Sequence, residues 1–159
     1  MRNFQRVEEP VILRENHVKW TTQWVELSQK NTGARFNWYR FDNLSAREHI
    51  LPSLAEQTDS HCSFCDAFPV GGVSNETVEH FRPKNQFPDL AYTWSNLYYC
   101  CDACQSAKGE KWEKWDLLLL NPDASDYSFS RYFEFDFTTG EIKPNLLSEI
   151  QDQQRAIKT

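Results

Sequence analysis

The sequence predicts an α+β fold, and three patterns along its 159 residues support this prediction. Apolar residues near the N-terminus recur at helical spacing, five cysteines gather in the central part, and β-favouring aromatic residues near the C-terminus flank a Thr-Gly turn. Hydrophobic residues make up 40% of the chain and charged residues 25%, which is typical of a soluble globular protein. This length suits one domain, or one core with an appended lobe.

Residues 1–59 are expected to form an N-terminal helical segment packed on the core. The first helix is predicted over residues 11–30, because Trp20, Trp24 and Leu27 fall at i, i+4 and i+7 and therefore share one helix face. An Asn-Thr-Gly sequence follows and is typical of a helix end. The aromatic residues of this segment are interpreted as core or partner-facing groups rather than as base-stacking surfaces.

A second helix of this segment is predicted over residues 43–57. Asn43 or Ser45 would cap its N-terminus by accepting a backbone hydrogen bond. Pro52 lies inside the range, and proline disrupts a helix interior because it has no N–H group to donate. The helix is therefore expected to begin at Pro52 or to bend there.

The central segment, residues 60–115, is interpreted as the core that carries the chemistry. Alternation predicts a short strand over residues 77–81, which Pro83 ends because proline cannot donate to a strand ladder. Residues 111–120 alternate charged and apolar side chains, and this pattern predicts an amphipathic helix, or a helix that runs into a strand.

The remaining segment, residues 116–159, is predicted to hold a hairpin followed by a helix. Aromatic residues and an isoleucine flank the Thr139-Gly140 turn and indicate the hairpin over residues 131–143. The short helix is expected over residues 146–157.

The cysteines carry the most specific signal in the sequence. Cys62-x-x-Cys65 and Cys101-x-x-Cys104 form two matched pairs, and in a reducing cytosol such clustering indicates a metal rather than disulfides. Each turn places two sulfurs on one side of a tight loop, so two turns together complete a tetrahedral Zn²⁺ site. Four protein ligands leave no open position for water, so the predicted zinc is structural and contributes to folding.

Alternatives to this zinc site stay open from the residues alone. The two pairs could be buried reduced cysteines or redox dithiols. His61 and Cys100 adjoin the pairs and could each replace a ligand, although the repeated spacing favours the other four cysteines.

Composition also limits the functions that the chain can have. Its net charge of −6 excludes binding of nucleic acid through a global positive field, so any phosphate contact needs a local patch, a metal ion or a basic partner. No apolar run approaches the length of a membrane span, and the first residues contain no apolar signal region. A cytoplasmic protein without a membrane partner is therefore expected.

Polar residues between and after the cysteine pairs are the candidates for chemistry. Neutral His80 could act as a general base, and Glu79 offers a hard oxygen for Mg²⁺ or Mn²⁺. Neighbouring strand residues point to opposite faces, so the two need a bent or terminal strand to share one site. From the residues alone, a structural core histidine and solvated lysines remain the plainer interpretation.

Taken together, these motifs resemble a zinc-stabilised HNH endonuclease. The resemblance rests on the two cysteine pairs, on the Val-Glu-His-Phe-Arg-Pro-Lys sequence of residues 78–84, on the Trp-Ser-Asn-Leu of residues 94–97, and on the Lys-Gly that follows the second pair. More narrowly, the chain is similar to the PtuB-type HNH proteins of Septu and retron-associated anti-phage systems. The similarity covers residues 60–145 well and residues 1–59 weakly. Such proteins continue through a further helical stretch after a segment like residues 153–156, so the C-terminal part is expected to be shortened.

The resemblance implies a ββα-metal active site, in which two strands and a helix surround one divalent ion beside the zinc. In that arrangement His80 matches the general base, Glu79 an acidic ligand of the catalytic Mg²⁺ or Mn²⁺, and Asn96 the residue that braces the histidine loop. The position of the second catalytic-metal ligand, normally Asn or His, holds Gln105, whose amide oxygen lies one methylene further out. This departure puts the catalytic ion in doubt.

The resemblance also implies substrate and partners. Phosphate contacts are expected from Arg82, Lys84 and Lys108, with DNA or possibly RNA as substrate and a 5′-phosphate product. The expected partner is an ATPase subunit of the same defence system, since this sequence has no phosphate-binding Gly-x-x-x-x-Gly-Lys loop of its own. Two rivals are a catalytically impaired zinc-binding adaptor, which binds the ATPase or nucleic acid, and a zinc-containing protein–protein adaptor unrelated to nucleases.

Overall fold

The structure is a computed structural model that describes residues 1–31, 33–110, 112 and 119–159. Helices and strands occur together, and every strand pairs locally and antiparallel with its neighbour in the sequence, as expected for an α+β fold. Along the chain the elements are α1 (Val11–Lys30), β1 (Arg40–Phe41), β2 (Leu44–Ser45), α2 (Ala46–Glu56), β3 (Glu76–His80), the 3₁₀ turns η1 (Pro88–Leu90) and η2 (Trp94–Asn96), β4 (Leu97–Cys101), α3 (Asp102–Lys108), α4 (Phe129–Tyr132), β5 (Phe133–Asp136), β6 (Glu141–Pro144) and α5 (Ile150–Lys158).

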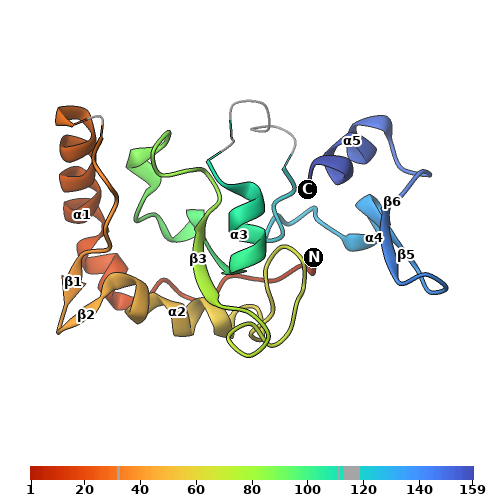
Figure 1. The fold of residues 1–159 in the computed structure, drawn as a ribbon, viewed down its shortest axis with the longest axis horizontal. Helices are drawn as coiled ribbons and strands as arrows, with labels where there is room; N and C mark the ends of the chain where they lie inside the picture. The colour runs from red at the N-terminus through yellow and green to blue at the C-terminus, as the bar shows by residue number, and fades with distance from the viewer. Residues whose placement is uncertain (32, 111, 113–118) are drawn as a thin grey trace.

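Helix α1 forms one end of the elongated molecule, as Figure 1 shows, and it confirms the helix predicted over residues 11–30. Its buried face consists of Leu13, Trp20 and Trp24, whereas Leu27 is 46% exposed. The buried residues of this helix therefore lie in its first two thirds, and Leu27 lies beyond them.

Helix α2 begins at a capping box rather than at Pro52. The Ser45 side chain accepts from the backbone N–H of Glu48, and the Glu48 carboxylate accepts from the backbone N–H of Ser45 at 2.7 Å. The helix then continues past Pro52 to Glu56, so the expected start at Pro52 is wrong. Its apolar residues join α1 and β4 in one hydrophobic core, which includes Ile50, Leu54, Leu97 and Tyr99.

Strand β3 lies near the middle of the molecule, close to α3 (Figure 1), and β4 pairs with β3 and is followed directly by α3. Their register pairs Glu79 with Tyr98 and His80 with Leu97. The predicted strand over residues 77–81 is confirmed with a shift of one residue. All five residues of β4 are buried, and this strand supports β3, which carries Glu79 and His80.

The C-terminal lobe contains the predicted hairpin and helix, with different ends. Strands β5 and β6 pair around a turn in which Gly140 has a φ of +76°, a conformation that favours glycine. Tyr132 belongs to the preceding helix α4, and α5 begins at Ile150 because Asn145 closes a turn with the backbone of Leu147 and Ser148. A second hydrophobic cluster holds the lobe together; it contains Met1, Leu120, Tyr127, Tyr132 and Ala156.

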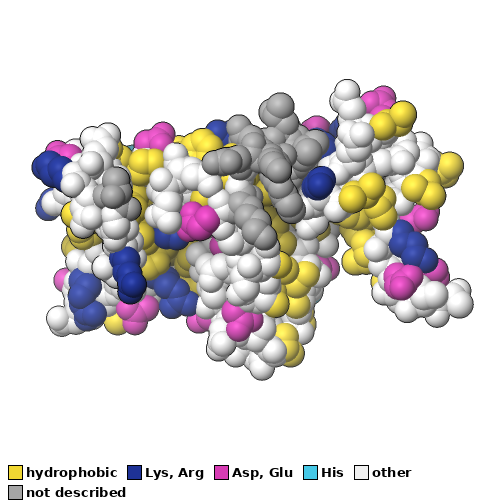
Figure 2. All heavy atoms as spheres, turned by 45° about the horizontal axis from the view of Figure 1, so that its top comes forward, with side chains coloured by type: hydrophobic (Ala, Val, Ile, Leu, Met, Phe, Trp, Pro, Cys, Tyr) yellow, Lys and Arg dark blue, Asp and Glu magenta, His cyan; other side chains and the backbone are white. Residues whose placement is uncertain are grey.

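Two further findings concern the chain as a whole. In the part of the chain that the structure describes, no helix combines the length and the apolarity that crossing a membrane requires. Basic and acidic side chains are interspersed on the face drawn in Figure 2, in agreement with the absence of a global positive field. The helix predicted over residues 111–120 falls largely outside the described residues.

Candidate active site beside a four-cysteine cluster

The two cysteine pairs converge as their spacing predicts. The sulfur atoms of Cys62, Cys65, Cys101 and Cys104 all lie within 4.8 Å of one another, and those of Cys65 and Cys101 are 3.7 Å apart. Tetrahedral coordination with Zn–S bonds of about 2.3 Å requires sulfur separations of about 3.8 Å. The four thiols therefore fit a metal ion such as zinc.

Backbone donors and the start of α3 position these sulfurs. The N–H of Cys104 donates to the sulfur of Cys101, which caps the helix, at 3.4 Å, and the N–H of Cys101 donates to the sulfur of Cys62 at 3.5 Å. Cys100 hydrogen-bonds the carbonyl of Cys101 and the thiols of Cys62 and Cys104, but it is not part of the group of four sulfurs that all lie close to one another, and His61 faces Asp66. Among the described residues, the arrangement favours the four predicted cysteines over either alternative ligand.

The cluster fixes α3 against β3. Cys101 ends β4 and Cys104 lies in the first turn of α3, so a metal bound there joins the loop after α2 to the strand and the helix. Gln105 and Lys108, three residues apart, share the face of α3 that reaches β3. The site is therefore assembled from the end of β3 and one face of α3.

His80 is held as a neutral imidazole. Its side chain is 5% exposed, and it is stacked on Trp38 with ring centroids 5.4 Å apart. Its Nε2 lies 3.0 Å from the carbonyl oxygen of Ala91, which can only accept, so Nε2 carries the proton and Nδ1 keeps its lone pair. Burial, assisted by the charge of Lys84, lowers the pKa of His80 to about 3.

Glu79 lies beside His80 and is also buried. Burial raises its pKa above the ordinary value, while the charge and hydrogen bond of Lys108 act in the opposite direction. The Lys108 ammonium is 2.6 Å from Glu79 Oε1 and 2.9 Å from the carbonyl oxygen of His80. The side-chain amide of Gln105 donates to the carbonyl of Val78 at 3.1 Å and also hydrogen-bonds Glu79.

Asn96 holds the loop that follows His80. Its Oδ1 accepts from the N–H of Arg82 at 2.8 Å, and its Nδ2 donates to the carbonyls of Arg82 and Leu90 at 3.1 Å each. The side chain is buried, so these three hydrogen bonds satisfy backbone polar groups of the loop that would otherwise need water as a partner. This geometry agrees with the expected bracing role, which stays a prediction for catalysis.

The predicted phosphate contacts lie in different surroundings. Lys84 lines the cavity, with its ammonium 3.7 Å from Glu110 and 5.4 Å from the ring of Phe36. The Arg82 guanidinium lies over the rings of Phe87 and Trp112, and Arg82 is not among the residues that line the cavity.

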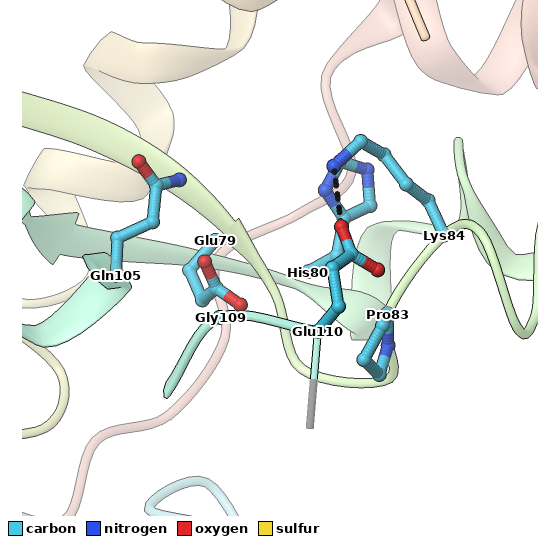
Figure 3. A pocket seen from close by; sticks show the side chains of 7 residues that line it. All are labelled: Glu79, His80, Pro83, Lys84, Gln105, Gly109 and Glu110. Atoms are coloured by element: carbon cyan, nitrogen blue, oxygen red, sulfur yellow. Dashed lines mark ion pairs between the residues drawn. The ribbon is translucent and has the colours of Figure 1, made fainter. Parts of the chain in front are cut away.

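A cavity of about 270 Å³ connects the members of the site (Figure 3). In the view of Figure 3, Glu79 lies between Gln105 and His80, and the ion pair of Lys84 with Glu110 lies beside the His80 ring. Sequence reasoning missed Glu110, although it directly follows the Lys-Gly motif. The cavity is lined by Glu79, His80, Pro83, Lys84, Gln105, Gly109 and Glu110.

Comparison with known proteins gives one partial similarity to report. No family model matches the chain. The Septu protein PtuB of Bacillus thuringiensis is 32% identical over 63 residues, which are 40% of this chain. The matched part spans 24% of the length of that protein. The chain is therefore similar over a part of its length to a Septu protein and contains a four-cysteine cluster that fits a metal such as zinc.

Proposed function

We propose that this protein is an HNH-type endonuclease that hydrolyses phosphodiester bonds, with DNA as its first candidate substrate. One observation carries the proposal: a neutral His80, tied through Nε2 to the Ala91 carbonyl, lies beside Glu79 in a cavity next to the cysteine cluster. In this proposal β3, β4 and α3 are the ββα unit, and the zinc beside it has a structural role.

The chemistry begins with the lone pair on His80 Nδ1, which accepts a proton from a water molecule. The water oxygen attacks the phosphorus, the bond from phosphorus to the 3′-oxygen breaks, and the leaving oxygen takes up a proton. The products carry a 5′-phosphate and a 3′-hydroxyl. The Ala91 carbonyl keeps the imidazole in the required tautomer, and Asn96 holds the loop that supplies the histidine.

The donor set next to His80 suits a hard divalent ion. The carboxylate of Glu79 and the amide of Gln105 are ligand types of Mg²⁺ and Mn²⁺, although the Gln105 amide oxygen would have to turn toward the ion. Such an ion, when bound, neutralises charge on the phosphate and on the leaving oxygen. Lys84 lines the cavity, and in this proposal it contacts phosphate.

The biological setting follows from the partial similarity. We propose that the chain is the effector of an anti-phage defence system of the Septu or retron-associated type and works in the cytoplasm with an ATPase subunit. The match to a Septu protein supports this setting. A basic partner also fits the net charge of −6, because the chain needs help to hold a polyanion.

The test is cleavage of DNA and RNA by the zinc-loaded protein with Mg²⁺ or Mn²⁺, with and without the ATPase. His80→Ala should lower the rate by about 100-fold or more, the contribution typical of a general base. His49→Ala is the matched control, since His49 lies on α2, hydrogen-bonds the carbonyl of Phe41 in β1 and does not line the cavity. Equal cleavage by wild type and His80→Ala would refute the proposal.

A second candidate is an adaptor that binds zinc and a partner without hydrolysis. The contact of Lys108 with Glu79 favours it, because an ammonium already neutralises the carboxylate expected to hold the catalytic ion. This candidate predicts a folded, zinc-loaded protein that binds the ATPase and cuts neither DNA nor RNA under any of these conditions.

A further inference from the structure

The Lys108 ammonium is bound as a cation by two oxygens of the candidate site. It lies 2.6 Å from a carboxylate oxygen of Glu79 and 2.9 Å from the carbonyl oxygen of His80. Both partners of the ion pair are buried, with side chains 10% and 8% exposed. Water therefore screens this pair weakly, and the contact is part of the interior.

Carboxylate and carbonyl oxygens are also the ligands that hard divalent cations prefer. Mg²⁺ binds oxygen at about 2.0–2.1 Å and tolerates little distortion. An ion that close to the Glu79 oxygen would stand within a few ångströms of the Lys108 ammonium, with like charge and little solvent between them. The Oε1 atom that Lys108 contacts cannot also bind the ion at that distance, and an ion on the other carboxylate oxygen would still face the like charge of the ammonium at short range.

We propose that Lys108 competes with the divalent cation for Glu79, so that metal binding requires its ammonium to leave the carboxylate. The proposal rests on the proposed function, since it concerns the same ion. Lys108 ends α3, and its four-carbon side chain can swing away by rotamer changes without movement of the strand. The freed ammonium is then available to a phosphate group, which is the role expected for Lys108 from the sequence.

The competition has a thermodynamic consequence. The apparent affinity for Mg²⁺ or Mn²⁺ is lowered by the free energy needed to separate Lys108 from Glu79. A bound phosphate that attracts the ammonium returns part of this free energy, so phosphate and metal should bind with positive coupling. The chain would thus hold its catalytic ion weakly until nucleic acid is present.

Mn²⁺ binding to the zinc-loaded full chain, followed by the electron paramagnetic resonance of free Mn²⁺, tests the proposal. Lys108→Met keeps the aliphatic stem and removes the ammonium; it should tighten Mn²⁺ binding about tenfold, within the usual range of coupling between sites. Lys84→Met removes a lysine that lines the cavity with Glu79 but pairs with Glu110, and it should change the affinity much less. A Lys108→Met protein that also carries Glu79→Gln should lose the gain.

The proposal is overturned if folded, zinc-loaded Lys108→Met binds Mn²⁺ no more tightly than Lys84→Met. A second measurement needs no variant: saturating Mg²⁺ should raise the acetylation rate of Lys108 several-fold, while exposed Lys30 on α1 stays constant as the reference. An acetylation rate of Lys108 that does not change at saturating Mg²⁺ also overturns the proposal. Tighter binding by Lys108→Met without any cleavage by the wild type would refute the proposed nuclease and leave the competition standing.

Discussion

Asn96 offers a sharp test of how the loop after His80 is held. The substitution Asn96→Ala removes one acceptor and two donor contacts, all to backbone groups of Arg82 and Leu90. Each hydrogen bond contributes a net stabilisation of about 1 kcal/mol, and the backbone groups that lose their partner stay buried. The expected loss is about 3 kcal/mol of unfolding free energy, a large part of the stability of a domain.

The assay is urea unfolding of the zinc-loaded protein, with Ser95→Ala as the matched control. Ser95 is the exposed neighbour of Asn96 in the same turn, and its removal should change the free energy by less than about 0.5 kcal/mol. Asn96→Asp adds a further test, because it turns an oxygen toward two carbonyl oxygens while keeping the contact with the Arg82 N–H. A loss below about 1 kcal/mol in both variants would refute the bracing role.

Three other predictions concern the cluster, the histidine and the N-terminal segment. Cys101→Ser should lose bound zinc, whereas Cys100→Ser should retain it, as measured by metal analysis; equal zinc content in both would contradict the ligand set. Because the pKa of His80 falls to about 3 in the fold, the unfolded chain takes up protons first below pH 6.5. Unfolding free energy should therefore fall by about 2 kcal/mol between pH 7 and pH 5, and His80→Gln should lose this share of the pH dependence. Arg6 pairs with Asp123 and donates to the carbonyls of Trp94, Ser95 and Leu97, so Arg6→Ala should cost about 3 kcal/mol. Arg14→Ala, which breaks only an exposed pair with Glu8, should cost less than about 1 kcal/mol; similar losses in thermal unfolding would contradict this assignment.

Local patterns made the main elements and the cysteine cluster predictable. Helix α1 has the predicted ends because its tryptophan spacing and the following Asn-Thr-Gly are local signals. The four cysteines converge as predicted. The repeated Cys-x-x-Cys spacing identifies the four ligands and also indicates the tight turn that carries each pair. The hairpin of β5 and β6 surrounds the predicted Thr-Gly turn for the same reason.

Other features depend on packing that no local pattern records. The β1–β2 hairpin has strands of two residues around Asp42 and Asn43, both at positive φ, and such short strands leave no alternation to detect. Helix α2 continues through Pro52 because the Ser45 capping box fixes its start about two turns earlier. The contact of Lys108 with Glu79 depends on how α3 packs against β3, which the sequence does not show, and the family resemblance implied a phosphate contact for Lys108 instead.

The state of the His80 ring tests the central claim most directly. Long-range ¹H–¹⁵N correlation spectra of the zinc-loaded protein at neutral pH report which ring nitrogen carries the proton. The account predicts a proton on Nε2, donated to the Ala91 carbonyl, and a bare Nδ1 ready to accept a proton from water. A proton on Nδ1, or a doubly protonated ring, would contradict the assignment of His80 as the general base.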